Sequence, residues 1–347
     1  MPEEEKRLRL AFIGCGGHST MSLQPAICQV PEIEYVAACD IVEERAREAA
    51  RRFGAKAWYT DFVRMLERER PDAVVVVGHP KMHEEVGIEC LRRGFHVLME
   101  KPPSLTVEGA RRVAEAARES GRFCMVATHW RHMPSHALLK ELTGREEFGR
   151  LTVVEATYSA PDRGPAFGVE DFAWGFMLNQ AIHPLDCLQF LGGRIVEVEA
   201  RGGAVEGEKL LFVARLLFEG GAEGVLVLHG CAPTIYARVG ARGSGPAWAE
   251  VENFARLRYV GPKAWAGRGG GFFDLPAQTW EVGNWHPRST CLGYVEEFRH
   301  FAHCVLRGEQ PRASAEDAYR AMLALDAIVR SAREGRPVRL DEGGDEA

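Results

Sequence analysis

Residues 8–19 read LRLAFIGCGGHS, an apolar segment that runs directly into a glycine-rich turn. The density of leucine, phenylalanine and isoleucine in its first half indicates a buried β-strand. Gly14 and Gly16 occupy the first two positions of the pattern G-x-G-x-x-G, where a tight turn and the close approach of a phosphate exclude a side chain. Ser19, small but not glycine, occupies the third. Glycine turns also occur without a ligand, so the flanking elements decide whether this one binds a phosphate.

A second apolar segment, IEYVAACD (33–40), ends in Asp40. At this position of a βαβ unit an acid accepts hydrogen bonds from both hydroxyls of an adenosine ribose and repels a 2′-phosphate. We therefore expect NAD(H) as the cofactor, with NADP(H) disfavoured. Gly17 and His18 lie inside the turn, so we include them with Gly14, Gly16 and Ser19 among the cofactor-binding residues.

The first third of the chain alternates between the two types of element. Strands are predicted at 8–14, 33–40, 55–61, 72–80, 95–100 and 122–130. Helices are predicted up to about residue 27 and at 42–54, 61–71, 83–94 and 106–121. Six strands separated by helices predict a doubly wound parallel sheet, the Rossmann architecture. The β-branched run at 72–80 suits a strand that is buried on both faces.

The pattern changes after residue 127. Longer strands are predicted at 151–160, 194–205, 209–221 and 222–231, with helices at 175–193, 294–308 and 314–335. A glycine-rich loop is expected at 261–276 and a frayed tail at 341–347. We therefore predict an α/β protein with two domains. Residues 1–127 form the NAD-binding domain, and residues 128–347 form a substrate-binding and oligomerisation domain around a large, mostly antiparallel open sheet.

Two segments should reach the cofactor, because ligands of doubly wound sheets bind at the carboxyl ends of the strands. GHPKMH (78–83) follows the fourth strand and EKPPS (100–104) follows the fifth. His79 and His83 are cofactor candidates on this ground, although a helix cap or a surface position explains His79 equally well. Buried charges are costly, so Glu100 and Lys101 must reach a pocket, a partner or the surface. A cis Lys101–Pro102 bond could aim the lysine into a cleft, whereas the alternative is a solvated pair on a surface turn.

The overall composition excludes several classes of protein. Of the 347 residues, 46% are hydrophobic and 27% charged, as in soluble globular proteins. The net charge of −6 offers no basic footprint for nucleic acid, and no apolar stretch is long enough to cross a membrane. Nine scattered cysteines without a C-x-x-C pair favour reduced thiols, and the charged start MPEEEKRLRL is unlike a secretory signal. We expect a cytoplasmic protein.

The stretch HWRHMPSH (129–136) contains three histidines that could suggest a metal site. Pro134 should interrupt a helix there, and no acid or cysteine lies at ligand spacing, so we predict no metal site. Arg131 is the better functional candidate, as a donor to a carboxylate or phosphate.

Taken together, these motifs resemble the Gfo/Idh/MocA family, which includes glucose–fructose oxidoreductase and inositol dehydrogenases. The resemblance rests on the glycine turn, Asp40, the 78–83 loop, Glu100-Lys101-Pro102 and Arg131. It continues through NQAIHPLD (179–186) and the C-terminal stretch 301–340, and so covers almost the whole chain. It implies a Rossmann domain followed by an α/β domain whose open sheet packs against other subunits, giving a homodimer or homotetramer.

The resemblance also implies roles for individual residues. Lys101 corresponds to the family lysine that contacts the nicotinamide ribose and the reacting substrate oxygen. A helix of the second domain usually carries an acid, then histidine four residues later, then often another acid. Asn179, His183 and Asp186 hold these places, so the first acid is replaced by an amide, as in the N-Q-G-I-H variant of some nucleotide-sugar and sugar-acid dehydrogenases. Asn179 can orient a hydroxyl but cannot act as a base.

These observations predict an NAD(H)-dependent dehydrogenase that acts on a secondary alcohol or ketone of a sugar, cyclitol or sugar acid. Lys101 and His183 are the predicted catalytic residues, and Asn179, Arg131 and Asp186 the predicted substrate-binding residues. Two alternatives stay open. The protein could use bound NAD in a reaction without net redox change, such as elimination or glycoside cleavage through transient oxidation. It could also be a non-enzymatic NAD sensor, although it retains both Lys101 and His183.

Overall fold

The structure, a computed structural model, describes residues 6–161, 166–207, 209–261, 277–283 and 288–340. The chain forms two compact units. The first comprises residues 1–132 and 287–319, and the second comprises residues 133–286 and 320–347. The predicted domain ranges differ from these units mainly at 287–319, which packs with the first unit although it follows the second in sequence.

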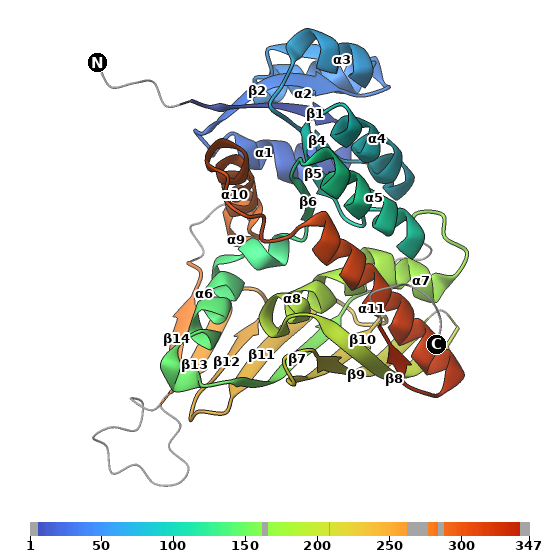
Figure 1. The fold of residues 1–347 in the computed structure, drawn as a ribbon, viewed down its shortest axis with the longest axis vertical. Coiled ribbons are helices and arrows are strands. Elements are labelled where there is room, and N and C mark those ends of the chain that lie inside the picture. The colour runs from blue at the N-terminus through green and yellow to red at the C-terminus, as the bar shows by residue number, and fades with distance from the viewer. Residues whose placement is uncertain (1–5, 162–165, 208, 262–276, 284–287, 341–347) are drawn as a thin grey trace. The chain divides into compact units, whose positions relative to one another are not determined.

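The first unit is built on a six-stranded sheet in the order β3-β2-β1-β4-β5-β6, and every neighbouring pair is parallel (Figure 1). The predicted doubly wound sheet is therefore confirmed. Its strands are β1 (Leu8–Ile13), β2 (Ile33–Cys39), β3 (Ala57–Tyr59), β4 (Ala73–Val76), β5 (His96–Glu100) and β6 (Cys124–Ala127).

Helices cover both faces of this sheet. One apolar cluster contains Leu8, Leu10 and Phe12 of β1 together with residues of α1 and α10. A second cluster contains Ala11 and Ile13 of the same strand together with residues of α3, α4 and α5. The alternation of side chains along a strand thus divides the core into two layers. The helices are η1 (Ser19–Leu23), α1 (Gln24–Ile27), α2 (Glu43–Phe53), α3 (Phe62–Glu69), α4 (Pro80–Arg92), α5 (Val107–Ser120), η2 (His129–His132), α9 (Arg288–Cys291) and α10 (Tyr294–Arg307).

The second unit is built on a nine-stranded sheet in the order β14-β13-β12-β11-β7-β10-β9-β8-β15. Only the β7–β10 pair is parallel, so the predicted mostly antiparallel sheet is confirmed. Its strands are β7 (Leu151–Ser159), β8 (Ile195–Glu206), β9 (Lys209–Phe218), β10 (Glu223–His229), β11 (Tyr236–Gly243), β12 (Trp248–Glu252), β13 (Arg256–Val260), β14 (Gln278–Glu281) and β15 (Val338–Arg339).

Helices lie on one face of the nine-stranded sheet and leave the other face uncovered among the described residues (Figure 1). Alternate residues of β9 and β10 are buried, and between them Val213 and Val225 are exposed. The helices of this unit are α6 (Pro134–Thr143), η3 (Glu146–Phe148), α7 (Phe172–Phe176), η4 (Met177–Ala181), α8 (Ile182–Gly192) and most of α11 (Ala315–Glu334).

Helix α6 corrects one expectation. Pro134 does not prevent a helix in HWRHMPSH but occupies its first turn, where its missing N–H costs nothing. The short helix η2 ends just before it, at His132. The predicted loop at 261–276, apart from Gly261, and the predicted tail at 341–347 lie outside the described residues.

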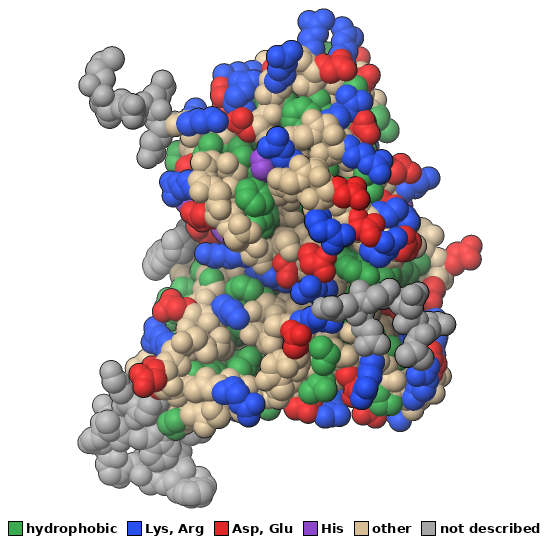
Figure 2. Space-filling model, in the orientation of Figure 1, with side chains coloured by type: hydrophobic (Ala, Val, Ile, Leu, Met, Phe, Trp, Pro, Cys, Tyr) green, Lys and Arg blue, Asp and Glu red, His purple; other side chains and the backbone are tan. Residues whose placement is uncertain are grey.

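The surface carries charges of both signs. Figure 2 shows Lys and Arg side chains interspersed with Asp and Glu over the visible face of each unit. Within the described ranges, no helix is long and apolar enough to cross a bilayer.

Candidate active site

The glycine turn between β1 and the following helix requires Gly14. Its φ is +107°, and a Cβ placed there would lie 1.8 Å from the carbonyl oxygen of Val77, just beyond β4. Gly16 differs, because a Cβ placed there would meet nothing within 4 Å. Gly14 therefore lets the turn pack closely against the end of β4, whereas the space beside Gly16 is open. A backbone that is exposed in this way can approach a phosphate group closely.

Ser19 fills the third position of the turn with a buried hydroxyl. Its Oγ accepts a hydrogen bond from Nε2 of Gln24 at 2.9 Å, and the hydroxyl of Tyr35 donates to Oε1 of Gln24 at 3.2 Å. Buried hydrogen bonds through Gln24 therefore satisfy the hydroxyl of Ser19, at a position where the usual pattern has glycine. A Cβ placed at Gly17 would lie 3.5 Å from Cε of Met21, at ordinary contact distance.

Asp40 follows β2 directly and faces the same turn. Its Oδ2 accepts a hydrogen bond from the backbone N–H of Cys15 at 2.8 Å, and its Oδ1 accepts one from Val42 at 2.9 Å. These two donors fix the carboxylate beside the glycine turn, and each oxygen keeps a further lone pair for a ligand. The next residue, Ile41, is 91% exposed. Ile41 is not among the predicted site residues, although its place directly after the acid was the available signal.

Glu100 ends β5 and pairs with His18 of the glycine turn. The His18 Nε2 and Glu100 Oε1 atoms are 3.0 Å apart, and the Glu100 side chain is only 5% exposed. Burial would raise the pKa of Glu100, but the charge and hydrogen bond of His18 and the charge of Lys101 outweigh it and lower that pKa to about 2. Burial would likewise lower the pKa of His18, but Glu100 outweighs it and raises that pKa above 6.5. The predicted turn residue and the predicted E-K-P acid are thus brought together.

Lys101 lies at the carboxyl end of β5, and its bond to Pro102 is cis. Burial lowers the pKa of Lys101 below its ordinary 10.5, and the charge of Glu100 acts in the opposite direction. The lysine therefore sits in a partly desolvated position beside a fixed carboxylate, where its hydrogen bonds to a ligand would be strengthened.

The two histidines of the 78–83 loop differ in their surroundings. His83 is buried, with Nε2 accepting from the N–H of Gly78 at 2.9 Å and Nδ1 lying 2.8 Å from the carbonyl oxygen of Pro102. It therefore ties the end of β4 to the turn after β5, and burial lowers its pKa to about 4. His79 is exposed and caps α4, with its Nδ1 accepting from the N–H of Lys81 at 3.3 Å. These contacts favour a supporting role for His83, whereas cofactor contact by either histidine stays a prediction.

Arg131 has contacts within the first unit. Its side chain is buried, donates from NH1 to the carbonyl oxygen of Arg312, and lies 3.7 Å from Oδ2 of Asp317. These contacts favour a structural role that joins η2 to the first turn of α11 and to the segment before it. Substrate binding by Arg131 stays a prediction.

Among the residues that the structure describes, no group of three His, Cys, Asp or Glu side chains could hold a metal ion. His129 instead stacks on Tyr294 with ring centroids 4.6 Å apart, and its Nδ1 lies 2.7 Å from the carbonyl oxygen of Leu292.

The second unit carries the other predicted site residues on one helical segment formed by α7, η4 and α8. Asn179 lies in η4, which is a π-helical turn, and the buried residues His183 and Asp186 lie in α8. Pro184 explains the wide turn, because its ring crowds the carbonyl four residues earlier and it has no N–H to donate to it. The hydroxyl of Tyr158 on β7 donates to Oε1 of Gln180 at 2.6 Å and fastens the π-helical turn to the sheet.

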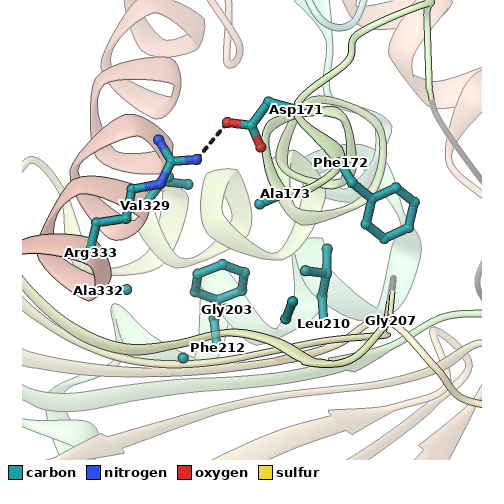
Figure 3. Close-up of a pocket in the computed structure, with 12 residues that line it drawn as sticks. Asp171, Phe172, Ala173, Gly203, Gly207, Leu210, Phe212, Val329, Ala332 and Arg333 are labelled. Atoms are coloured by element: carbon teal, nitrogen blue, oxygen red, sulfur yellow. Dashed lines mark hydrogen bonds and ion pairs between the residues drawn. The ribbon is translucent and has the colours of Figure 1, made fainter.

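A cavity of about 390 Å³ also lies in the second unit, between the β8–β9 hairpin and helices α7 and α11 (Figure 3). An ion pair between Asp171 Oδ2 and Arg333 NH2, 2.6 Å long, bridges it. Asp171 also caps α7, the helix that leads into η4. None of the predicted site residues lines this cavity, whose other walls are Phe172, Ala173, Gly202, Gly203, Ala204, Gly207, Leu210, Phe212, Val329 and Ala332.

Comparison with known proteins identifies the family. The model of an oxidoreductase family with an NAD-binding Rossmann fold, Gfo/Idh/MocA, matches residues 8–128, and the model of the family's C-terminal domain matches residues 136–244. The scyllo-inositol 2-dehydrogenase (NAD(+)) of Bacillus subtilis is 26% identical over 350 residues, 97% of each chain. The myo-inositol 2-dehydrogenase of Thermotoga maritima is 26% identical over 347 residues, 96% of this chain and 99% of the relative.

A solved structure extends the likeness to the fold. A dehydrogenase from Chromobacterium violaceum superposes with a TM-score of 0.88 at 24% identity and covers 95% of this chain and 96% of its own. The open space above Gly16, the Asp40 carboxylate and the exposed Ile41 fit the dinucleotide that such a domain binds. The chain therefore belongs to the Gfo/Idh/MocA family of oxidoreductases and contains its NAD-binding Rossmann domain.

Proposed function

We propose that this protein is an NAD(H)-dependent dehydrogenase that oxidises a secondary alcohol of a polyhydroxylated substrate, or reduces the corresponding ketone. The supporting observation is the carboxyl edge of the six-stranded sheet. There the glycine turn follows β1, Asp40 follows β2, and Glu100 and Lys101 lie at the end of β5, all in one parallel sheet. Ligands of doubly wound sheets bind at this edge.

In this proposal the dinucleotide lies across the glycine turn. The backbone around Gly16 and Gly17 holds the diphosphate, and Asp40 accepts hydrogen bonds from the adenosine ribose. The exposed side chain of Ile41 provides an apolar surface for the adenine. Because a 2′-phosphate would meet the fixed carboxylate of Asp40, NADP(H) binds more weakly than NAD(H).

Lys101 and His183 carry the proposed chemistry, as the family resemblance implies. When bound, the cofactor accepts or donates a hydride. Lys101 donates a hydrogen bond to the substrate oxygen and stabilises the negative charge that develops there. His183 takes the hydroxyl proton, a task suited to an imidazole, which titrates near neutral pH. Asn179 orients a neighbouring hydroxyl, and Asp186, one helical turn after His183, helps to position the imidazole or the substrate.

The substrate class follows from the relatives. Those that match nearly the whole chain include inositol dehydrogenases of Bacillus subtilis and Thermotoga maritima and a D-apiose dehydrogenase of Paraburkholderia graminis. We therefore propose a cyclitol or a sugar as the substrate. The amide of Asn179, in place of the usual acid, favours hydrogen bonding to a hydroxyl over binding of a cationic group.

The test is a spectrophotometric screen of the full-length protein. Inositols, aldoses and sugar acids are each supplied with NAD⁺ and with NADP⁺, and absorbance of the reduced nicotinamide is followed. We expect turnover with at least one cyclitol or sugar and a preference for NAD⁺. The matched control is Lys101→Met, which keeps an apolar chain of similar length and removes the donor. If wild type and K101M gave the same rates, the active-site assignment would be wrong.

A further inference from the structure

His18 has an unusual place for a titratable side chain. It lies within the glycine turn, two residues after Gly16, and reaches across to the end of β5, where its Nε2 is 3.0 Å from Oε1 of Glu100. The imidazole is 47% exposed, whereas the Glu100 side chain is 5% exposed. One ring nitrogen is therefore fixed on a buried carboxylate beside the proposed diphosphate position, and Nδ1 remains to take up or release a proton.

Two neighbours of His18 keep the same charge across the neutral pH range. Glu100, with a pKa of about 2, stays anionic above pH 6, and His129, whose pKa burial lowers to about 4, stays neutral. Lys101 opposes protonation of His18 through its positive charge, and the ring of Tyr294 packs edge-on with its centroid 6.1 Å away. Burial would lower the pKa of His18, but Glu100 raises it above 6.5 on balance.

We propose that binding of the dinucleotide is coupled to proton uptake by Nδ1 of His18. The inference rests on the proposed function, because it takes the glycine turn as the diphosphate site. The diphosphate carries two negative charges at neutral pH and would lie within the turn that contains His18. This anionic charge stabilises the imidazolium and offsets the repulsion from Lys101, so that the solvent supplies a proton as the cofactor binds. The Nδ1–H can then donate to a phosphate oxygen.

The sign of the effect follows from linkage. Binding raises the pKa of His18, so affinity is highest where His18 is already protonated in the free protein and falls as pH rises through the pKa of the bound state. A rise of about one unit, as expected for anionic charge at the edge of solvent, weakens binding about tenfold between pH 6 and pH 9. The same rise corresponds to a maximum uptake of about half a proton between the two pKa values.

The experiment is isothermal titration calorimetry of the full chain in buffers of different ionisation enthalpy, from pH 6 to pH 9. The probes are NAD⁺, NADH and ADP-ribose, which share the diphosphate and differ at the nicotinamide. We expect equal proton uptake for all three. His18→Gln can still donate to Glu100 but cannot take up a proton, so its affinity should not vary with pH. Lys101→Arg, which removes the lysine titration, should keep the effect.

A matched control lies at the start of β5, the strand that Glu100 ends. His96 opens β5, where its Nδ1 accepts from the N–H of Phe123, and His96→Gln should leave the proton uptake unchanged. An NMR titration of the His18 ring in the wild-type protein, with and without ADP-ribose, measures the shift without any variant. Three results would overturn the inference: proton uptake on binding of NADH but not of NAD⁺ or ADP-ribose, an NAD affinity that varies equally with pH in wild type and H18Q, or a His18 pKa that ADP-ribose leaves unchanged. Absence of any NAD binding would instead overturn the proposed function.

Discussion

Alanine substitutions of Gly14 and Gly16 should separate the folding role of the turn from its binding role. In Gly14→Ala the new Cβ would lie 1.8 Å from the Val77 oxygen, whereas ordinary contact begins at 3.4 Å, so the two groups must move apart by about 1.6 Å. That movement disturbs the end of the β1–β4 pair, where the N–H of Val77 donates to the Ile13 oxygen at 2.9 Å.

The cost of Gly14→Ala can be estimated from these contacts. A non-glycine residue at φ +107° costs roughly 1–3 kcal/mol, and each backbone hydrogen bond that is lost costs about 1 kcal/mol. The free energy of unfolding should therefore fall by about 3 kcal/mol. For a unit of this size, the melting temperature should fall by roughly 6–12 °C.

Gly16→Ala is the matched control. Its φ lies outside the left-handed region and its Cβ would meet nothing within 4 Å, so its melting temperature should stay within about 2 °C of the wild type. Its affinity for NAD should fall at least tenfold, about 1.4 kcal/mol, because the methyl group occupies the proposed diphosphate space. Differential scanning calorimetry and titration calorimetry measure the two effects. A Gly14→Ala variant as stable as the wild type would contradict the folding role of Gly14, and wild-type NAD affinity in Gly16→Ala would contradict the binding role of Gly16.

Three further predictions follow from the proposed site and the open sheet. Lys101→Ala and His183→Ala should each reduce kcat by roughly 10²–10⁴-fold. The double variant should lose less activity than the product of the two single losses, because both groups are proposed to act on one oxygen. If His183→Ala kept wild-type turnover, His183 would not be the base. NAD(H) should bind at least ten times more tightly than NADP(H), a difference of about 1.4 kcal/mol in binding free energy. Asp40→Ala should reduce this difference in affinity. Equal affinities of the wild-type protein for the two cofactors in calorimetry would contradict the role of Asp40. The uncovered face of the nine-stranded sheet exposes Val213 and Val225, and we expect it to form the interface of a closed homodimer or homotetramer. Val225→Glu should dissociate this oligomer. A wild-type monomer at micromolar concentration in light scattering would exclude the interface.

Much of the first unit could be predicted because its signals are local. The apolar run at 72–80 contains the buried strand β4, and Gly54 ends α2 with φ +79°, as its place after a helical pattern predicts. Ser314, the first residue of the helix predicted at 314–335, caps α11, with its Oγ accepting from the N–H of Asp317 at 3.1 Å. Each feature depends on residues that are close in sequence, and chain order alone then fixes a parallel sheet.

Other features could not be predicted because they depend on distant residues. Strands β11 to β14 combine arginine, glutamate and tryptophan on the face that helices leave uncovered, so they lack the apolar density of β9. Helix α10 packs with the first unit because Phe298 meets Phe12 of β1, with ring centroids 6.0 Å apart, although almost 300 residues separate them. The pairing of His18 with Glu100 likewise joins two turns that sequence analysis could only treat separately.

In the proposed reaction a hydride passes directly between a substrate carbon and the nicotinamide. The most direct measurement supplies unlabelled NAD⁺ together with the substrate found in the screen, deuterated at the carbinol carbon, and analyses the cofactor by mass spectrometry. We predict that each turnover yields NADH one mass unit heavier, with the deuterium on nicotinamide C4, and that Lys101→Met slows the transfer by roughly 10²–10⁴-fold. Conversion of the substrate without net formation of deuterated NADH would contradict the claim and favour a reaction in which bound NAD is only transiently reduced.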